Sequence, residues 1–188
     1  VESGKIDGFL AENTYVSSAL WEGAKIDTVD QTIDRTEAGF IFQKDSAKSA
    51  TIREQLNTFL SSAKANGLLD QLNKKWIGKT EPTELFDHNS LSGENGTLKV
   101  AVSPDLKPVS YIKNGVITGY EVEVLQHFAK KYGYETMVWS DMFFCPWNNN
   151  CYYIPKREMP EEYKKALAPG VIPVYWDYYH KDEKSYDD

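Results

Sequence analysis

The sequence predicts an α/β protein, and three observations between residues 96 and 139 carry this prediction. Residues 98–102 are short, apolar and β-branched, which is typical of a buried strand. Residues 120–132 repeat apolar side chains at helical spacing, and residues 135–139 have the composition of a second strand. A strand, a helix and a strand in this order predict a parallel crossover, which is right-handed in nearly all proteins.

A hairpin is expected between the first strand and the helix. Asn114-Gly115 lies between the apolar residues 111–112 and 116–117, and a type I′ turn needs positive φ at both central residues. Gly119 is expected to end the hairpin. Gly133 is placed to end the helix as its C′ residue.

The first 78 residues predict further strands and helices. Residues 6–10 and 39–42 are short apolar runs, which indicate strands. Thr51 and Glu54 form a capping box, in which a hydroxyl and a carboxylate satisfy backbone amides reciprocally. We therefore expect helices after Asn13 or Thr14, over residues 52–66, and over residues 68–75.

The remaining segments differ in composition. Residues 79–96 are polar and contain proline and glycine, which predicts a linker. Residues 141–188 form a tail rich in proline and aromatic residues, in which residues 160–167 favour a short helix. Pro173 restricts any strand over residues 171–175 to a sheet edge. The predicted organisation is 1–78, a linker at 79–96, a βαβ unit at 97–140, and the tail.

Composition excludes several classes of partner. The formal net charge of −7 argues against nucleic acid and against anionic membrane surfaces. No apolar run approaches the roughly 20 residues that span a bilayer. Cys145 and Cys151 lie close together in sequence. This spacing permits either a disulfide or two free thiols. A metal site is less favoured, because the sequence has no second pair of cysteines.

Two motifs resemble a known family. Pro108 followed by Gly119-Tyr120-Glu121-Val122-Glu123 resembles the first βαβ unit of the type II extracytoplasmic solute-binding proteins, the polar amino acid receptors of ABC importers. Lys75-Trp76-Ile77-Gly78 is similar to the family's C-terminal signature, and residues 4–8 are similar to a strand that precedes it. The resemblance implies a periplasmic-binding-protein-like lobe with flanking helices.

The same resemblance implies a function. We expect non-catalytic binding of a small polar solute such as an amino acid, between two lobes that close by a hinge motion. It further implies a monomer located in the periplasm or at the cell surface, with a membrane importer permease or a receptor as partner. The alternatives are a ligand-sensing module of a signalling receptor, a truncated module that retains no binding, and an enzyme such as the lytic transglycosylases that carry this domain.

The two motifs occur in the reverse of the family's order. The residues that resemble the end of a module come before those that resemble its beginning. Either the chain is a slice through a tandem pair of modules, or it is one permuted module. The permuted module predicts that strands 98–102, 135–139 and 39–42 share one sheet, covered by helices from both parts of the chain.

Four residues are candidates for ligand contact. The resemblance places Glu12, five residues after Asp7, where the family binds a ligand ammonium, although a solvated acid at a helix start has the same sequence. Glu123 matches an acid on the family's first helix, where N-terminal helix electrostatics is the alternative role. Tyr111 and Tyr120 could line a cleft wall or simply pack in the core.

No pattern indicates catalysis, a cofactor or a metal. The histidines, His88, His127 and His180, are isolated, and no metalloprotease, P-loop or nucleophile-elbow motif is present. Thr32 and Arg35 have the spacing of the family's carboxylate clamp, but we interpret this two-residue pattern as a chance match.

Overall fold

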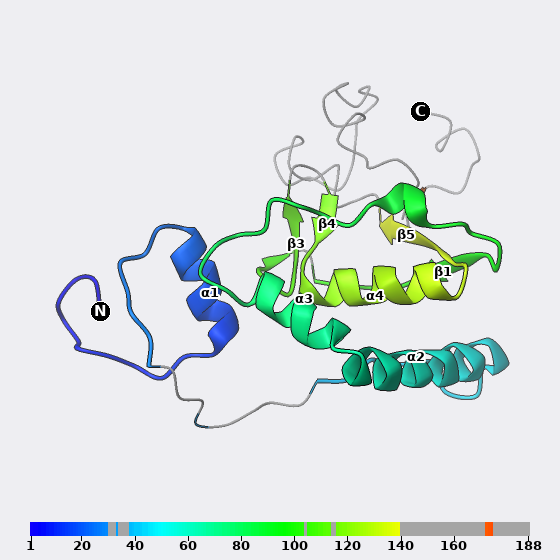
Figure 1. Ribbon diagram of the computed structural model, residues 1–188, viewed down its shortest axis with the longest axis horizontal. Coiled ribbons are helices and arrows are strands. Elements are labelled where there is room, and N and C mark those ends of the chain that lie inside the picture. Colours follow the sequence, from blue (N-terminus) through cyan, green and yellow to red (C-terminus); the bar gives the residue numbers. More distant parts are fainter. Residues whose placement is uncertain (30–32, 34–37, 104, 114–115, 140–171, 175–188) are drawn as a thin grey trace, which may run out of the picture. The chain divides into compact units, whose positions relative to one another are not determined.

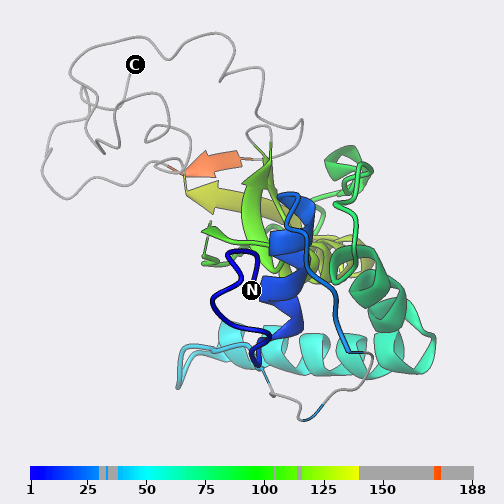
Figure 2. The same ribbon diagram turned by 90° about the vertical axis from the view of Figure 1, so that its left-hand side faces the viewer.

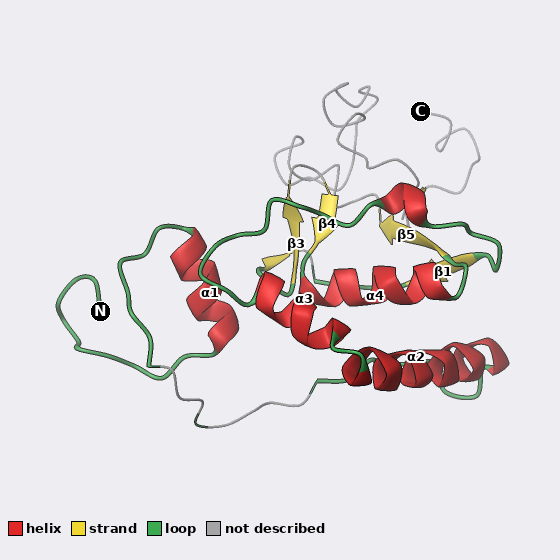
Figure 3. Ribbon diagram, in the orientation of Figure 1, coloured by secondary structure: helices red, strands yellow, loops and turns green. Residues whose placement is uncertain are grey.

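The computed structural model describes residues 1–29, 33, 38–103, 105–113, 116–139 and 172–174 (Figure 1). The chain divides into two compact units, Val1–Thr83 and Glu84–Asp188. The secondary structure described in the first unit is helical, whereas the second combines strands with a helix (Figure 3). A parallel sheet and an antiparallel sheet are both present, so the chain is a mixed α/β protein.

The first unit contains helices α1 (Asn13–Trp21), α2 (Ala47–Ala65) and α3 (Leu68–Trp76). Helices α2 and α3 pack against each other. The indole Nε1 of Trp21 donates a hydrogen bond of 2.9 Å to the carbonyl oxygen of Gly78, which ties α1 to the segment after α3. The buried apolar side chains of α2 and α3 are Leu56, Phe59, Ala63, Leu72 and Trp76.

Helix α2 begins earlier than the capping box predicted. The N-cap is Ser46, whose hydroxyl oxygen accepts a hydrogen bond of 3.2 Å from the Ser49 backbone N–H. Thr51 lies inside the helix, and its hydroxyl donates instead to the Ala47 carbonyl. The capping box was therefore the wrong start signal, because the preceding residues, Ala47 and Lys48, are good helix formers that extend the helix back to a serine.

The two strands predicted in the first unit do not form. Residues 6–10 and 39–42 are irregular, and none of their apolar side chains is fully buried: Leu10 is 79% exposed and Ile41 is 98% exposed, whereas Phe40 and Phe42 are half-buried. A strand needs a neighbouring strand and a buried face. Neither segment pairs with a strand in the described part of the chain. The shared sheet that the permuted module required therefore lacks its 39–42 member.

The second unit contains the predicted parallel crossover. Strand β1 (Thr97–Lys99) pairs in parallel with β5 (Glu135–Trp139), and helix α4 (Tyr120–Lys131) lies between them in sequence. Strand β6 (Ile172–Val174) pairs in parallel with β5, beside which it lies in Figure 2. The order of this sheet is β1-β5-β6. Among the described strands β6 is therefore an edge strand, as expected from Pro173. Strand β1 is shorter than predicted, because its ladder with β5 ends at Lys99.

The predicted hairpin forms the second sheet. Strands β3 (Ser110–Lys113) and β4 (Val116–Thr118) are antiparallel, with Ile112 opposite Ile117. A short strand that the sequence did not predict, β2 (Asp105–Leu106), pairs with β3 on its other side. The turn residues Asn114 and Gly115 lie outside the described residues.

Both predicted glycine positions are confirmed. Gly119 has φ of 126° at the N-cap of α4, and a Cβ there would lie 2.4 Å from the Val109 carbonyl oxygen. Only glycine fits this junction between hairpin and helix. Gly133 has φ of 65° directly after the C-cap Tyr132. The central apolar side chains of α4, Val122, Val124, Leu125, Phe128 and Ala129, are buried.

The predicted linker is ordered in its second half. The chain divides between Thr83 and Glu84, inside the range 79–96. Residues 84–96 then pack on the βαβ unit: the Asn95 N–H donates to the Gly133 carbonyl, and the 3₁₀ helix η1 (His88–Ser90) contacts α4 through His88. The second half of the predicted linker at 79–96 is therefore part of the second unit. The predicted helix at 160–167 and the Cys145–Cys151 pair lie outside the described residues.

Candidate functional site

A polar loop follows the carboxyl end of β1. The Ser103 hydroxyl donates to Asp105 Oδ1 at 2.8 Å, and the buried Ser110 hydroxyl donates to the Ser103 carbonyl oxygen at 2.6 Å. These bonds hold Asp105 at the start of β2 with its side chain exposed. In open α/β sheets, ligands bind outside the carboxyl ends of the strands. The loop is thus a candidate ligand-binding site, because it follows β1 and carries the hydroxyl of Ser103 and the carboxylate of Asp105.

The two tyrosines predicted to contact a ligand lie beside this loop. Tyr111 lies on β3 opposite Asp105 and is 6% exposed, with the Lys107 Nζ at 5.5 Å from its ring centroid. Tyr120 is half-buried at the first position of α4, and its N–H donates to the Pro108 carbonyl oxygen at 3.1 Å. Ligand contact by either residue stays a prediction, and the burial of Tyr111 gives it a packing role as well.

The acid on α4 that was predicted to contact a ligand is buried. Glu123 is 6% exposed, and its Oε1 lies 3.8 Å from the His127 Nε2 one turn later. The His127 ring also meets the Phe86 ring edge-on, with centroids 5.3 Å apart. Glu123 thus lies in the first turn of α4, where a carboxylate is favoured by the helix dipole.

Glu12 belongs to the first unit, whereas the other three candidates belong to the second. It is the N-cap of α1, but its side chain forms no capping hydrogen bond. The Thr14 hydroxyl donates to Glu12 Oε2 at 3.4 Å, and the carboxylate is exposed. The strand expected before it is irregular, so Glu12 does not follow a strand end as predicted. Its role in binding an amine stays a prediction. Arg35 lies outside the described residues.

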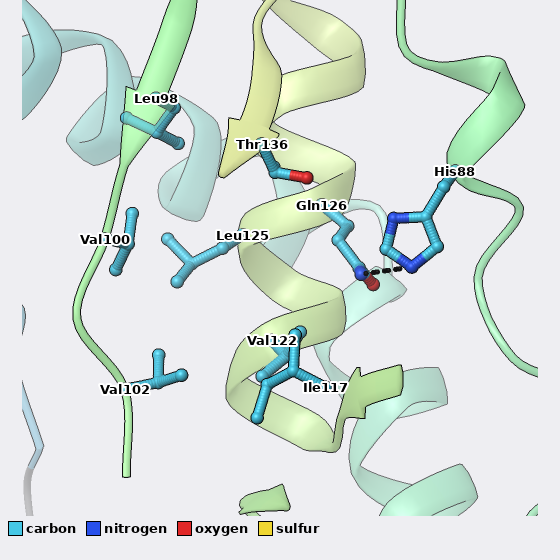
Figure 4. A pocket seen from close by; sticks show the side chains of 9 residues that line it. All are labelled: His88, Leu98, Val100, Val102, Ile117, Val122, Leu125, Gln126 and Thr136. Carbon is cyan, nitrogen blue, oxygen red and sulfur yellow. Dashed lines mark hydrogen bonds between the residues drawn. The ribbon is translucent and has the colours of Figure 1, made fainter. Parts of the chain in front are cut away.

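An apolar pocket lies between β1, β5 and α4 (Figure 4). The cavity is small, with a volume of about 40 Å³. Val100 and Val102 line one wall, in the segment that leaves the ladder after Lys99. The other lining side chains are Leu98, Ile117, Val122, Leu125, Thr136, Gln126 and His88.

His88 and Gln126 form the polar wall of this pocket. The Gln126 Nε2 lies 3.3 Å from the His88 Nε2, and both side chains are buried. The His88 Nδ1 is buried and has no hydrogen-bond partner among the described residues. Burial lowers the pKa of His88 below its usual 6.5, although the neighbouring Asp87 carboxylate acts in the opposite direction. The imidazole is therefore neutral near pH 7.

Sequence reasoning missed three of these residues. Asp105 could have been found as the first acid after the β1 strand, which is where an open sheet presents its ligand contacts. His88 and Gln126 are far apart in sequence, and no local pattern links them. Among the described residues, no cluster of histidine, cysteine and acidic side chains could hold a metal ion, and no helix is long and apolar enough to cross a membrane.

No protein-family model, curated protein or solved structure matches the chain. The interpretation of the site therefore rests on its residues and their geometry.

Proposed function

We propose that this chain binds a small polar solute without converting it, and that the solute contacts the loop at the carboxyl end of β1. The observation that carries the proposal is the exposed carboxylate of Asp105, which the Ser103 hydroxyl holds at the start of β2, in the segment that follows β1 in sequence. A positioned carboxylate offers charge-assisted hydrogen bonds, which are the natural partners of an ammonium group.

The charges of the loop favour a zwitterion such as an amino acid. Lys107 follows Asp105 closely in sequence, so the same segment carries both charge signs. An amino acid carries an ammonium and a carboxylate, and this pair of side chains complements both. The backbone N–H groups of Tyr120 and Glu121 donate to the carbonyl oxygens of Pro108 and Val109, so the start of α4 would form the neighbouring wall.

The finer architecture belongs to the same proposal. The parallel β1–α4–β5 crossover with an inserted hairpin supports the interpretation of residues 97–139 as the first part of a periplasmic-binding-protein-like lobe. The resemblance then implies an importer permease as the partner that receives the solute, in an extracytoplasmic setting. The alternative partner that the resemblance implies is a signalling receptor that uses the same module.

Calorimetry against a panel of amino acids tests the proposal. Asp105→Asn should weaken binding by about 1.5–3 kcal/mol, the usual value of a hydrogen bond to a charged group. Glu94→Gln is the matched control, because Glu94 is exposed in the turn before the amino end of β1. Glu12→Gln is a separate test of the family-based expectation for the first unit: a loss of about 1.5–3 kcal/mol in this variant, with Asp105→Asn unchanged, would place the ammonium contact at Glu12 instead of Asp105.

The possible outcomes separate clearly. Equal losses in the Asp105→Asn and Glu94→Gln variants would show a general charge effect and would overturn the assignment of the site. An absence of heat with every amino acid, with circular dichroism showing a folded chain, would overturn the amino acid class.

A further inference from the structure

We propose that residues 84–92 form an acid-sensitive strap, which the neutral side chain of His88 holds against α4 and which protonation of that side chain releases. The strap begins at the boundary between the two compact units. After the strap, Asn95 anchors the chain independently of His88, because its N–H and its side-chain Nδ2 donate to the carbonyl oxygens of Gly133 and Tyr132 at 2.8 and 2.9 Å. The proposal does not depend on solute binding at the polar loop.

His88 makes the deepest contact of the strap. It is the one residue of the strap that is fully buried, with 6% of its surface exposed. Its Nε2 lies 3.3 Å from the Gln126 Nε2 on α4 (Figure 4). The half-buried ring of Phe86 meets the rings of His88 and His127 edge-on, with centroids 5.9 and 5.3 Å apart. A titratable side chain therefore holds the strap on the helix.

The position of His88 suits a neutral imidazole and not an imidazolium. A protonated imidazole carries a hydrogen on both ring nitrogens and needs two acceptors. The Nδ1 is buried and has no hydrogen-bond partner among the described residues. Burying a charge without acceptors is costly, and burial accordingly lowers the pKa of His88. Protonation is therefore favoured when the strap is released and the ring lies in water.

The groups around His88 do little to stabilise a positive charge. The cavity that it lines is otherwise bounded by side chains from β1, β4, α4, β5 and the segment after β1 that do not titrate. The neighbouring Asp87 carboxylate raises the pKa of His88, but less than burial lowers it. The titratable residues within one turn of Gln126 on α4 are Glu123, His127 and Lys130. Lys130 is exposed, and the Glu123 Oε1 lies 3.8 Å from the His127 Nε2.

Release of the strap would change the surface of the second unit. His88 forms one wall of the small cavity, whose other walls include Leu98 and Leu125. These two side chains are only 6% and 7% exposed when the strap is in place. Without His88 they would border solvent, so mild acid would uncover an apolar patch between β1 and α4.

Hydrogen exchange of single amides on the full chain tests the strap. The Leu91 N–H donates to the His88 carbonyl oxygen at 3.1 Å and reports on the strap, whereas the Tyr134 N–H donates to the Ala129 carbonyl oxygen at 2.9 Å and reports on the end of α4. Protection factors, corrected for the intrinsic effect of pH, are compared at pH 7.5 and 5.5. Leu91 should be less protected than Tyr134 at both pH values. Its protection should fall several-fold at pH 5.5, and at most about tenfold, because the released strap takes up one proton below the usual pKa of 6.5.

Two histidine variants separate the strap from a general effect of acid. His88→Phe keeps a ring and removes the titration, so the Leu91 protection should be the same at both pH values. His127→Phe is the matched control, because it removes the other histidine that contacts Phe86, and the fall should persist. Circular dichroism checks that both variants fold. An NMR titration of the His88 ring in the wild-type chain gives a measurement that needs no variant, and the ring should titrate below pH 6.5.

Several results would overturn the strap. These are an unchanged Leu91 protection in the wild-type chain, an equal fall in His88→Phe, or a His88 ring that titrates at or above pH 6.5. Equal protection of Leu91 and Tyr134 would show that residues 84–92 open only with the whole unit, and would overturn it as well. None of these results bears on amino acid binding at the polar loop.

Discussion

Replacing Gly119 with alanine should strongly destabilise the second unit. Gly119 joins the hairpin to α4 with φ of 126° and ψ of 176°, a combination that is essentially confined to glycine. A Cβ would lie 2.4 Å from the Val109 carbonyl oxygen and 2.8 Å from the Pro108 carbonyl oxygen. Both oxygens are backbone atoms, so the clash cannot be relieved by rotating a side chain.

The magnitude follows from two contributions. A non-glycine residue in this backbone region costs of order 1–3 kcal/mol. The two carbonyls also accept hydrogen bonds from the first amides of α4, those of Tyr120 and Glu121, at 3.1 and 3.0 Å. Displacing them loses about 0.5–1.5 kcal/mol for each bond. The expected total loss in the free energy of unfolding is therefore about 2–6 kcal/mol.

Gly96→Ala is the matched control. Gly96 also has positive φ, but a Cβ there meets nothing within 4 Å. Denaturant unfolding by circular dichroism, with hydrogen exchange of the α4 amides to assign the unit, compares the two variants. A loss for Gly119→Ala within about 0.5 kcal/mol of the Gly96→Ala loss, the usual scatter of surface substitutions, would refute the steric argument.

Two further predictions concern the start of α2 and the buried histidine. Ser46→Ala should destabilise α2 by about 0.5–2 kcal/mol, as expected for a lost N-cap. Thr51→Ala should change stability little, because Thr51 lies inside the helix. Equal losses in the two variants would contradict Ser46 as the N-cap and favour the capping box as the helix start. His88 has a lowered pKa because of burial, so the unfolded chain binds more protons than the folded chain below about pH 6.5. The free energy of unfolding should therefore fall as pH drops through 6.5, and the fall should be smaller in His88→Phe; parallel pH profiles for the two proteins would contradict this linkage.

The elements that the sequence predicted well carry local signals. The hairpin follows from its turn dipeptide, and the end of α4 follows from Gly133, which adopts φ of 65°. The crossover pairing of residues 97–99 with 135–137 follows from two short apolar runs separated by a hairpin and a helix. Each strand and helix in this unit has a local signal, and the order of these elements along the chain predicts the crossover, so a single sequence is sufficient.

Most failures were in features that depend on distant partners, and one was a choice between two neighbouring signals. Residues 39–42 have strand composition, yet Ile41 is 98% exposed, because composition cannot supply a neighbouring strand. The start of α2 was misplaced because two competing caps lie close together and the chain uses the earlier one. The His88–Gln126 pair joins η1 to α4 across a long stretch of sequence. The two side chains meet only when the chain packs, so no local sequence motif predicts the pair.

The most direct test of the central claim is NMR mapping of backbone amides during titration with the amino acid panel. Binding at the carboxyl end of β1 predicts saturable shifts for the amides of residues 102, 103, 105–107 and 119–121. The turn at residues 93–96, at the opposite end of β1, should remain unchanged. Saturable shifts confined to that turn, or no shifts in the folded chain with any amino acid, would contradict solute binding at this strand end.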